Sequence, residues 1–270
     1  MPDTRSKIVG MVGLGEMGRP IAENIARAGF PVLAYDRSPQ ARADGVTLVD
    51  SPAGLAPAEV VIVIVPTDAD VTEVVAGPGG LFEHGRPGLT VVISASVDPA
   101  TCQRLAEQGR PRDIQVIDAA LTGGIRGAVK GEINLLIGGP QEVVDSIADV
   151  LDAFTAHCHV LGGVGAGQVG KSANNLIHWA EIVAIDEALR LAEACGVRPA
   201  ALREALMVGS ASSRTLREIE LMHFTWYVKD IEVANELAGR VGRELPVARL
   251  SRELMDQVSV GSVRQLLELP

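Results

Sequence analysis

The chain has 270 residues, 47% hydrophobic and 21% charged, enough to bury the core of one large or two medium domains. Its formal net charge of −10 excludes a general nucleic-acid or anionic-membrane surface, which needs clustered lysine and arginine, but not a small anionic ligand held by local donors. Because the N-terminus lacks an apolar signal core and charges interrupt the longest apolar stretch, residues 174–194, we expect a cytoplasmic protein without a membrane span.

The first predicted elements surround a glycine-rich turn. Residues 7–12 are strand-like, residues 20–28 are helix-like, and residues 31–35 are again strand-like. The turn between the first two allows close approach of the backbone to a pyrophosphate, which the helix N-terminus would face. The alternative is a glycine turn of some other α/β protein. The predicted cofactor-binding residues are Gly13, Leu14, Gly15, Glu16, Met17 and Gly18.

The end of the second predicted strand bears on which dinucleotide is used. Asp36 stands there, 18 residues after Gly18. Its carboxylate can accept hydrogen bonds from both ribose hydroxyls of an adenosine and would repel a 2′-phosphate. The next residue, Arg37, would attract such a phosphate or would be a solvated loop charge. The pair predicts NAD, with NADP as the alternative.

Strand-like runs alternate with helical segments up to about residue 163. Residues 60–65 are continuously apolar, as in a central parallel strand. Asp98 and Pro99 predict the start of a helix. Further strand-like runs lie at residues 90–93, 114–117 and 133–137. We predict a Rossmann-type α/β domain over residues 1–163, with a mostly parallel sheet covered on both faces.

Helical spacing replaces the strand-like runs after residues 163–167. A long helix is predicted over about residues 168–194, with shorter helices from Pro199, from about Trp226 and from about Pro246. The long helix is apolar around too much of its circumference for a simple surface helix, so we expect it to pack against the first domain, a second subunit or both. Residues 164–270 therefore predict an all-helical substrate and dimerisation domain, and a homodimer or higher homo-oligomer.

Three segments supply candidate reacting groups, of which the third, Lys229-Asp230, is an ordinary solvated charge pair when taken alone. Thr122 offers a hydroxyl, and Gly123 and Gly124 offer backbone N–H groups that could hold a carboxylate, although a plain glycine turn is the alternative. Lys171 and Asn175 are four residues apart and share one face of the long helix. The helix dipole lowers the pKa of a lysine near the helix start, which suits proton transfer to the alkoxide that forms in hydride transfer.

Neither a metal site nor a cysteine redox motif is indicated by the sequence. His157 and His159 share one side of a predicted strand, but no third ligand is spaced nearby, so we predict no metal site. Cys102, Cys158 and Cys195 are isolated, as expected for reduced thiols in the cytosol.

Taken together, the motifs resemble the β-hydroxyacid dehydrogenase family, which includes 3-hydroxyisobutyrate dehydrogenases and tartronate semialdehyde reductases. The family's glycine fingerprint, its substrate-binding Asp-Ala-Pro-Val-Ser-Gly-Gly, its Gly-x-Gly-x-x-x-Lys-x-x-Asn-Asn helix and its late Lys-Asp are matched at residues 13–18, 118–124, 165–175 and 229–230. The resemblance covers nearly the whole chain. It implies an NAD(P)-dependent oxidoreductase that interconverts a small 3-hydroxy acid and its semialdehyde or keto form.

The resemblance also implies roles for single residues. Lys171 would be the catalytic acid/base, and Asn175 would assist at the substrate. The substrate carboxylate would be bound by Thr122, Gly123 and Gly124. Beyond the glycine turn and Asp36, the cofactor would contact Val65, Pro66, Ser96 and Lys229. His178 and Trp179 are predicted to line the substrate pocket, with burial in the core as the alternative.

Departures from the family pattern limit what can be said of the substrate. Thr122 stands where serine is usual, Ala120 replaces proline, and Ile93 replaces an aspartate. The stretch 213–229 is shorter by about one loop, so a more open or rebuilt pocket is expected. An imine reductase and a non-catalytic NAD(P)-binding scaffold are the alternative functions. Lys171 argues against both, since the former usually has aspartate or tyrosine at that position and the latter typically loses the lysine.

Overall fold

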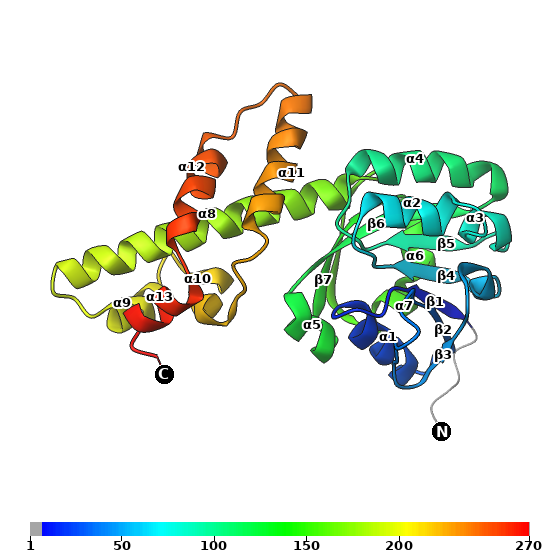
Figure 1. Cartoon of the computed structure of the whole chain (residues 1–270), viewed down its shortest axis with the longest axis horizontal. Helices are drawn as coiled ribbons and strands as arrows, with labels where there is room; N and C mark the ends of the chain where they lie inside the picture. The colour runs from blue at the N-terminus through cyan, green and yellow to red at the C-terminus, as the bar shows by residue number, and fades with distance from the viewer. Residues whose placement is uncertain (1–6, 270) are drawn as a thin grey trace. The chain divides into compact units, whose positions relative to one another are not determined.

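The computed structural model of the chain describes residues 7–269 and has two compact units, Met1–Lys171 and Ser172–Pro270. The long helix α8 (Ala166–Ala194) continues through the boundary between them (Figure 1). The predicted class, an α/β nucleotide-binding part followed by a helical part, is confirmed.

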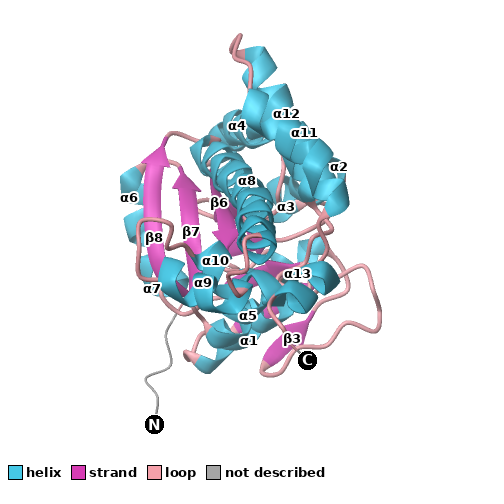
Figure 2. Ribbon diagram, turned by 90° about the vertical axis from the view of Figure 1, so that its left-hand side faces the viewer, coloured by secondary structure: helices cyan, strands magenta, loops and turns pink. Residues whose placement is uncertain are grey.

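The first unit is built on one eight-stranded sheet with the order β3-β2-β1-β4-β5-β6-β7-β8. All neighbouring strands are parallel except β6 and β7, which are antiparallel. Figure 2 shows β7 between β6 and β8. The strands are β1 (Val9–Val12), β2 (Val32–Tyr35), β3 (Val46–Leu48), β4 (Val60–Val63), β5 (Thr90–Ile93), β6 (Gln115–Thr122), β7 (Ile133–Gly138) and β8 (Thr155–Gly162). The strand order reverses at β1: the chain adds β2 and β3 on one side of it and then β4 on the other. In such sheets, ligands bind at the carboxyl ends of the strands beside this switch point.

Helices cover both faces of the sheet, as predicted. Alternate residues of β4 enter opposite cores: Val60 and Ile62 pack with one, Val61 and Val63 with the other. The first core is closed by α1 (Gly18–Arg27), α5 (Gly124–Lys130), α6 (Gln141–Ser146) and α7 (Ala148–Leu151). The second is closed by α2 (Asp68–Ala76), α3 (Leu81–His84) and α4 (Pro99–Gly109). Two 3-10 turns complete the unit, η1 (Pro52–Leu55) and η2 (Arg110–Arg112). Continuous burial explains why the central strands read as unbroken apolar runs.

The second unit is helical throughout the residues that the structure describes. Beyond α8 it contains α9 (Pro199–Leu206), α10 (Arg214–Glu218), η3 (Ile219–Leu221), α11 (Tyr227–Arg240), α12 (Pro246–Leu254), η4 (Met255–Gln257) and α13 (Val260–Leu266). Its core gathers Ile182, Leu189, Ile219, Ile231 and Val263. The predicted helix starts near Pro199, Trp226 and Pro246 are confirmed. Within residues 7–269, no helix combines the length and the apolar character that crossing a membrane requires.

The histidines of β8 and the three cysteines are the residues to consider for a metal site or a redox motif. His157 and His159 are on β8, with ring centroids 6.1 Å apart. In the described part of the chain, no three histidine, cysteine, aspartate or glutamate side chains are grouped to hold an ion. Cys102 is buried, and burial raises the pKa of its thiol, whereas Cys158 and Cys195 are exposed.

Candidate active site

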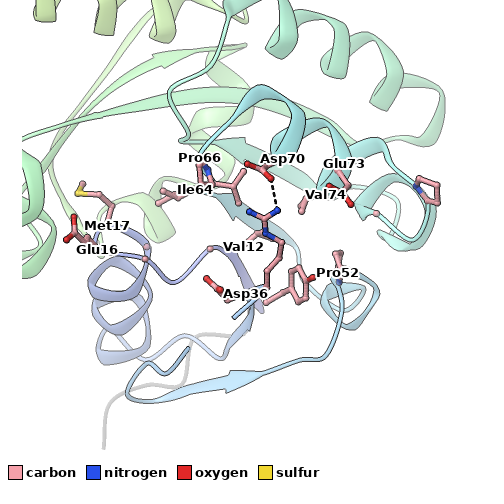
Figure 3. Close-up of a pocket in the computed structure, with 18 residues that line it drawn as sticks. Val12, Glu16, Met17, Asp36, Pro52, Ile64, Pro66, Asp70, Glu73 and Val74 are labelled. Carbon is pink, nitrogen blue, oxygen red and sulfur yellow. Dashed lines mark ion pairs between the residues drawn. The ribbon is translucent and has the colours of Figure 1, made fainter. Parts of the chain in front are cut away.

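A pocket of about 660 Å³ opens at the carboxyl ends of β1 and β4 (Figure 3). Its wall is formed by the glycine turn, the end of β2, the segment after β4 and the first turns of α2. Of the predicted cofactor residues, the wall includes Gly13, Gly15, Glu16, Met17, Gly18, Asp36, Arg37, Val65 and Pro66. The structure thus brings most of the predicted cofactor site together. Ser96 lies outside this wall, exposed in the loop after β5.

The three glycines of the turn have distinct geometries. Gly13 has φ +91°, and a Cβ there would overlap the carbonyl oxygen of Ile64. A Cβ on Gly18 would overlap the carbonyl oxygen of Gly13, which shows how closely α1 packs on the turn. A Cβ on Gly15 would meet nothing within 4 Å, so the backbone there is open to the pocket. This open cradle fits the pyrophosphate of a dinucleotide. The first turn of α1 has no acidic residue and no side-chain cap, which favours an anion at its N-terminus.

Asp36 is fixed by the backbone on either side of it. Its Oδ2 accepts a hydrogen bond from the N–H of Leu14 at 2.7 Å, and its Oδ1 accepts one from the N–H of Ser38 at 2.7 Å. Leu14 therefore acts through its backbone, by joining the glycine turn to the end of β2. Each carboxylate oxygen keeps acceptor capacity, as recognition of a ribose diol requires.

Arg37 pairs with a carboxylate that the sequence did not indicate. Its Nη1 lies 2.9 Å from Oδ1 of Asp70 on α2, the ion pair dashed in Figure 3. Asp70 and Glu73 both line the pocket. Neither residue belongs to a sequence motif. The start of α2 lies near the end of β2 because β1, β2 and β4 are parallel neighbours in the sheet.

Lys171 reaches the end of β6. Its Nζ donates a hydrogen bond to the carbonyl oxygen of Leu121 at 2.9 Å, directly before Thr122. The Thr122 hydroxyl donates to the carbonyl of Asn134 at 3.1 Å and accepts from the Asn134 side-chain amide at 2.9 Å. Gly123 and Gly124 follow with positive φ values of 109° and 65°. The structure therefore brings the predicted acid/base and the predicted carboxylate-binding segment side by side.

A buried carboxylate anchors the N-terminus of α8. Asp118 on β6 is fully buried and accepts hydrogen bonds from the N–H groups of Gly165 and Gln168, the latter at 2.9 Å. A Cβ on Gly167 would lie 2.7 Å from Asp118 Oδ2, so the helix comes this close only through glycine. Burial raises the pKa of the Asp118 carboxyl, while the backbone hydrogen bonds act in the opposite direction. Asp118 belongs to a recognised motif, but the sequence did not indicate this anchoring contact.

Gln168 connects the same helical turn to the loop after β5. Its side chain is buried; it donates to the carbonyl of Ala95 at 2.9 Å and accepts from the N–H of Val97 at 3.3 Å. These contacts hold the loop that carries Ser96. Nothing in the local sequence identified Gln168, because both partners lie more than 70 residues earlier in the chain.

Three predicted site residues belong to the second unit. Asn175 lies one helical turn beyond Lys171 on α8, and its Oδ1 accepts a hydrogen bond from the Asn174 side chain at 3.1 Å. Trp179 is 3% exposed and its indole N–H donates to Asp230 at 3.0 Å, the arrangement of a core aromatic. Lys229 is exposed on α11. Contacts of Asn175, Trp179 and Lys229 with ligands stay predictions.

Comparison with known proteins assigns the chain to a family. The family model described as the NAD-binding domain of 6-phosphogluconate dehydrogenase matches residues 8–163, and the one described as NAD-binding of NADP-dependent 3-hydroxyisobutyrate dehydrogenase matches residues 165–265. The chain belongs to the β-hydroxyacid dehydrogenase family. The family resemblance of its motifs is thereby confirmed. The chain is an NAD(P)-dependent oxidoreductase of the hydroxy-acid class.

Individual relatives agree with this assignment. The chain is 30% identical to 2-hydroxy-3-oxopropionate reductase of Escherichia coli (strain K12), over 96% of this chain and 93% of the relative. It is 31% identical to the probable mitochondrial 3-hydroxyisobutyrate dehydrogenase of Dictyostelium discoideum, over 78% and 67% of the two chains. The solved structure of 3-hydroxyisobutyrate dehydrogenase from Mycobacterium tuberculosis superimposes with a TM-score of 0.81 at 23% identity, covering 94% of both chains, and shows the shared fold.

Proposed function

We propose that the chain interconverts a small 3-hydroxy acid and its semialdehyde or keto form, with NAD as the preferred cofactor and Lys171 as the acid/base. The observation that carries the proposal is the position of the Lys171 amino group. It lies 2.9 Å from the carbonyl oxygen of Leu121, the residue directly before Thr122. An ammonium held beside a segment that can bind a carboxylate is suited to a small hydroxy-acid substrate.

The cofactor would be held by the residues of the first pocket. The glycine turn offers its backbone to the pyrophosphate, and Asp36 offers its carboxylate to the adenosine ribose. When bound, the reduced cofactor NADH would supply the hydride for reduction of the substrate, and NAD+ would accept the hydride in its oxidation. Further contacts, proposed from the family resemblance, are made by Val65, Pro66, Ser96 and Lys229.

Lys171 moves the proton that balances the hydride. In reduction, the substrate carbon gains a hydride and its oxygen takes a proton from the Lys171 ammonium; in oxidation, the neutral amine takes the hydroxyl proton. The Leu121 carbonyl uses one of the three N–H groups of the ammonium and so fixes its direction. Asn175, one turn further on α8, orients the substrate hydroxyl. Gly123 and Gly124 offer backbone N–H groups to the substrate carboxylate. Thr122 holds this segment in place through its hydrogen bonds with Asn134.

The substitution Lys171→Ala tests the proposal. It should lower turnover by about 10²- to 10⁴-fold, the usual contribution of general acid–base catalysis, while the Kd for NAD changes less than about twofold. The matched control is Lys130→Ala, which removes an exposed lysine at the end of α5.

The assay screens small 3-hydroxy acids with NAD and NADP, and the corresponding aldehydes with NADH and NADPH. Full turnover by the Lys171→Ala variant would refute the assigned role. Reduction of cyclic imines without any hydroxy-acid turnover would instead support an imine reductase.

We also propose that the protein acts in the cytoplasm as a homodimer or higher homo-oligomer. The support for the location is the three isolated cysteines, as in a reducing compartment, and the support for the oligomer is the exposed apolar side chains Ile177 and Leu191 on α8. Fractionation of cells and sedimentation of the purified chain test the two parts separately.

A further inference from the structure

The Arg37–Asp70 ion pair joins two walls of the dinucleotide pocket. Arg37 follows β2, Asp70 lies in the first turn of α2, and the charged atoms are 2.9 Å apart. The Arg37 side chain is 69% exposed, whereas that of Asp70 is only 17% exposed. The carboxylate is therefore the fixed member of the pair, and the guanidinium is the member that is held.

Asp70 is fixed by the N-terminal cap of its helix. Thr67 is the N-cap residue of α2; its Oγ1 accepts a hydrogen bond from the Asp70 N–H at 3.1 Å and lies 2.7 Å from Asp70 Oδ2, to which it donates. Oδ2 is thus engaged by Thr67, and Oδ1 is the oxygen that meets Arg37. This arrangement presents one carboxylate oxygen to the guanidinium in a set direction.

The pair affects which dinucleotide the pocket accepts. Arginine is the side chain best suited to a 2′-phosphate, because its planar guanidinium can donate two parallel hydrogen bonds. Arg37 stands next to Asp36, where an arginine would meet that phosphate. Its charge is instead compensated by Asp70, and NADP would have to compete with a fixed carboxylate for the guanidinium.

We propose that Asp70 is a specificity-determining residue, which selects NAD over NADP by holding Arg37 away from a 2′-phosphate. This inference rests on the proposed function, in that it takes the pocket to bind NAD(P). It adds that selection depends on α2 as well as on Asp36 at the end of β2.

The test is the substitution Asp70→Asn in the full chain. Asparagine keeps an oxygen that can accept from the Thr67 hydroxyl, so the cap of α2 remains, but the charge that holds Arg37 is lost. The Kd values for NADP+ and NAD+ are measured by isothermal titration calorimetry, which needs no substrate. We expect the Kd for NADP+ to fall about three- to fivefold, the size that a partly exposed ion pair allows, and the Kd for NAD+ to change less than twofold.

Two controls separate this role from a general effect of charge. Glu73→Gln removes another carboxylate from the same pocket wall and should change the NADP+ to NAD+ ratio less than Asp70→Asn does. In an Arg37→Ala background, Asp70→Asn should leave the ratio unchanged, because the residue through which Asp70 acts is gone.

The outcomes distinguish the two levels of the proposal. An unchanged ratio in Asp70→Asn, an equal change in Glu73→Gln, or a change that persists without Arg37 would overturn the role of Asp70 and leave the proposed function intact. If the unaltered chain binds neither NAD+ nor NADP+, the proposed function fails and this inference fails with it.

Discussion

Thr122 has a hydroxyl with one proton, and the structure directs that proton to the Asn134 carbonyl. The same oxygen accepts from the Asn134 amide, so two hydrogen bonds of the Thr122 side chain join the end of β6 to the start of β7. The hydroxyl thereby fixes the strand end from which Gly123 and Gly124 continue. Its place in substrate binding then includes holding this segment in position beside Lys171.

Two substitutions of Thr122 distinguish the contribution of its hydroxyl from that of its methyl group. Thr122→Val removes both hydrogen bonds to Asn134 and should lower the free energy of unfolding by about 1–2 kcal/mol. It should also raise KM for the hydroxy acid about tenfold or more, because the carboxylate-binding segment loses its support. Thr122→Ser keeps the hydroxyl and should stay within about twofold in KM. Steady-state kinetics and urea unfolding measure both quantities, and an unaltered KM in Thr122→Val would show that the Thr122 hydroxyl does not hold the carboxylate-binding segment in place.

Residues whose partners are near in sequence could be predicted, and those with distant partners could not. The glycines of residues 13–18 have roles set by the backbone of one strand-turn-helix, and the spacing of Asp36 follows from the same unit. Asp70, Asp118 and Gln168 meet partners 33, 50 and 71 residues away, respectively. Their side chains are common in soluble proteins, and only the packed sheet selects their partners.

At the next scale, α8 depends on β6 for its start. The residue before the helix is Gly165, which has no side chain to cap it. Asp118 on β6 instead accepts the hydrogen bonds of the free N–H groups. A buried carboxylate at a helix N-terminus both satisfies free N–H groups and interacts favourably with the helix dipole. The position of Lys171, one turn further, follows from this anchor.

Asp118→Ala should therefore destabilise the first unit more than loss of an ordinary cap. It leaves the N–H groups of Gly165 and Gln168 buried without their acceptor, which should lower the free energy of unfolding by about 2–4 kcal/mol. The comparison is Asp98→Ala, which removes the N-cap of α4, an oxygen that accepts from Ala100 at 2.8 Å, and should cost about 1 kcal/mol. Equal losses in the two variants, measured by urea unfolding, would show that Asp118 acts only as an ordinary cap.

The long, strongly patterned elements were predictable, and the short ones were not. Continuous apolar runs predicted β4 and β5, and helical spacing predicted α8, because burial sets these patterns directly. The strand β3 has three residues, mostly exposed, and is held by its pairing with β2. The helices α10 and α13 have five and seven residues, too few for a periodic signal, and depend on capping by Ser213 and Ser259.

For the whole molecule, the exposed face of α8 is the feature that the fold of one chain does not explain. Ile177 and Leu191 are 63% and 66% exposed, although both are large and apolar. Ala184, also exposed, lies midway between them, so three small or apolar residues recur every seven positions. A spacing of seven keeps side chains close to one line along a helix, which is the pattern of a seam between two helices. A second copy of the chain is the partner that our proposal of a homodimer provides.

The double substitution Ile177→Glu and Leu191→Glu tests this pairing. Each side chain is already exposed in the single chain, so the free energy of unfolding of the monomer should change by less than about 0.5 kcal/mol. In a symmetric dimer, however, the two substitutions would place four carboxylates in the contact, and the dissociation constant should rise by at least about 100-fold.

Sedimentation equilibrium measures the change, with Val208→Glu as the control, because Val208 is 90% exposed and lies outside α8. We expect the unaltered chain and the Val208→Glu variant to sediment as dimers, and the double variant as a monomer. A double variant that dimerises as tightly as the unaltered chain would place the subunit contact on another surface and leave the apolar row on α8 without a partner.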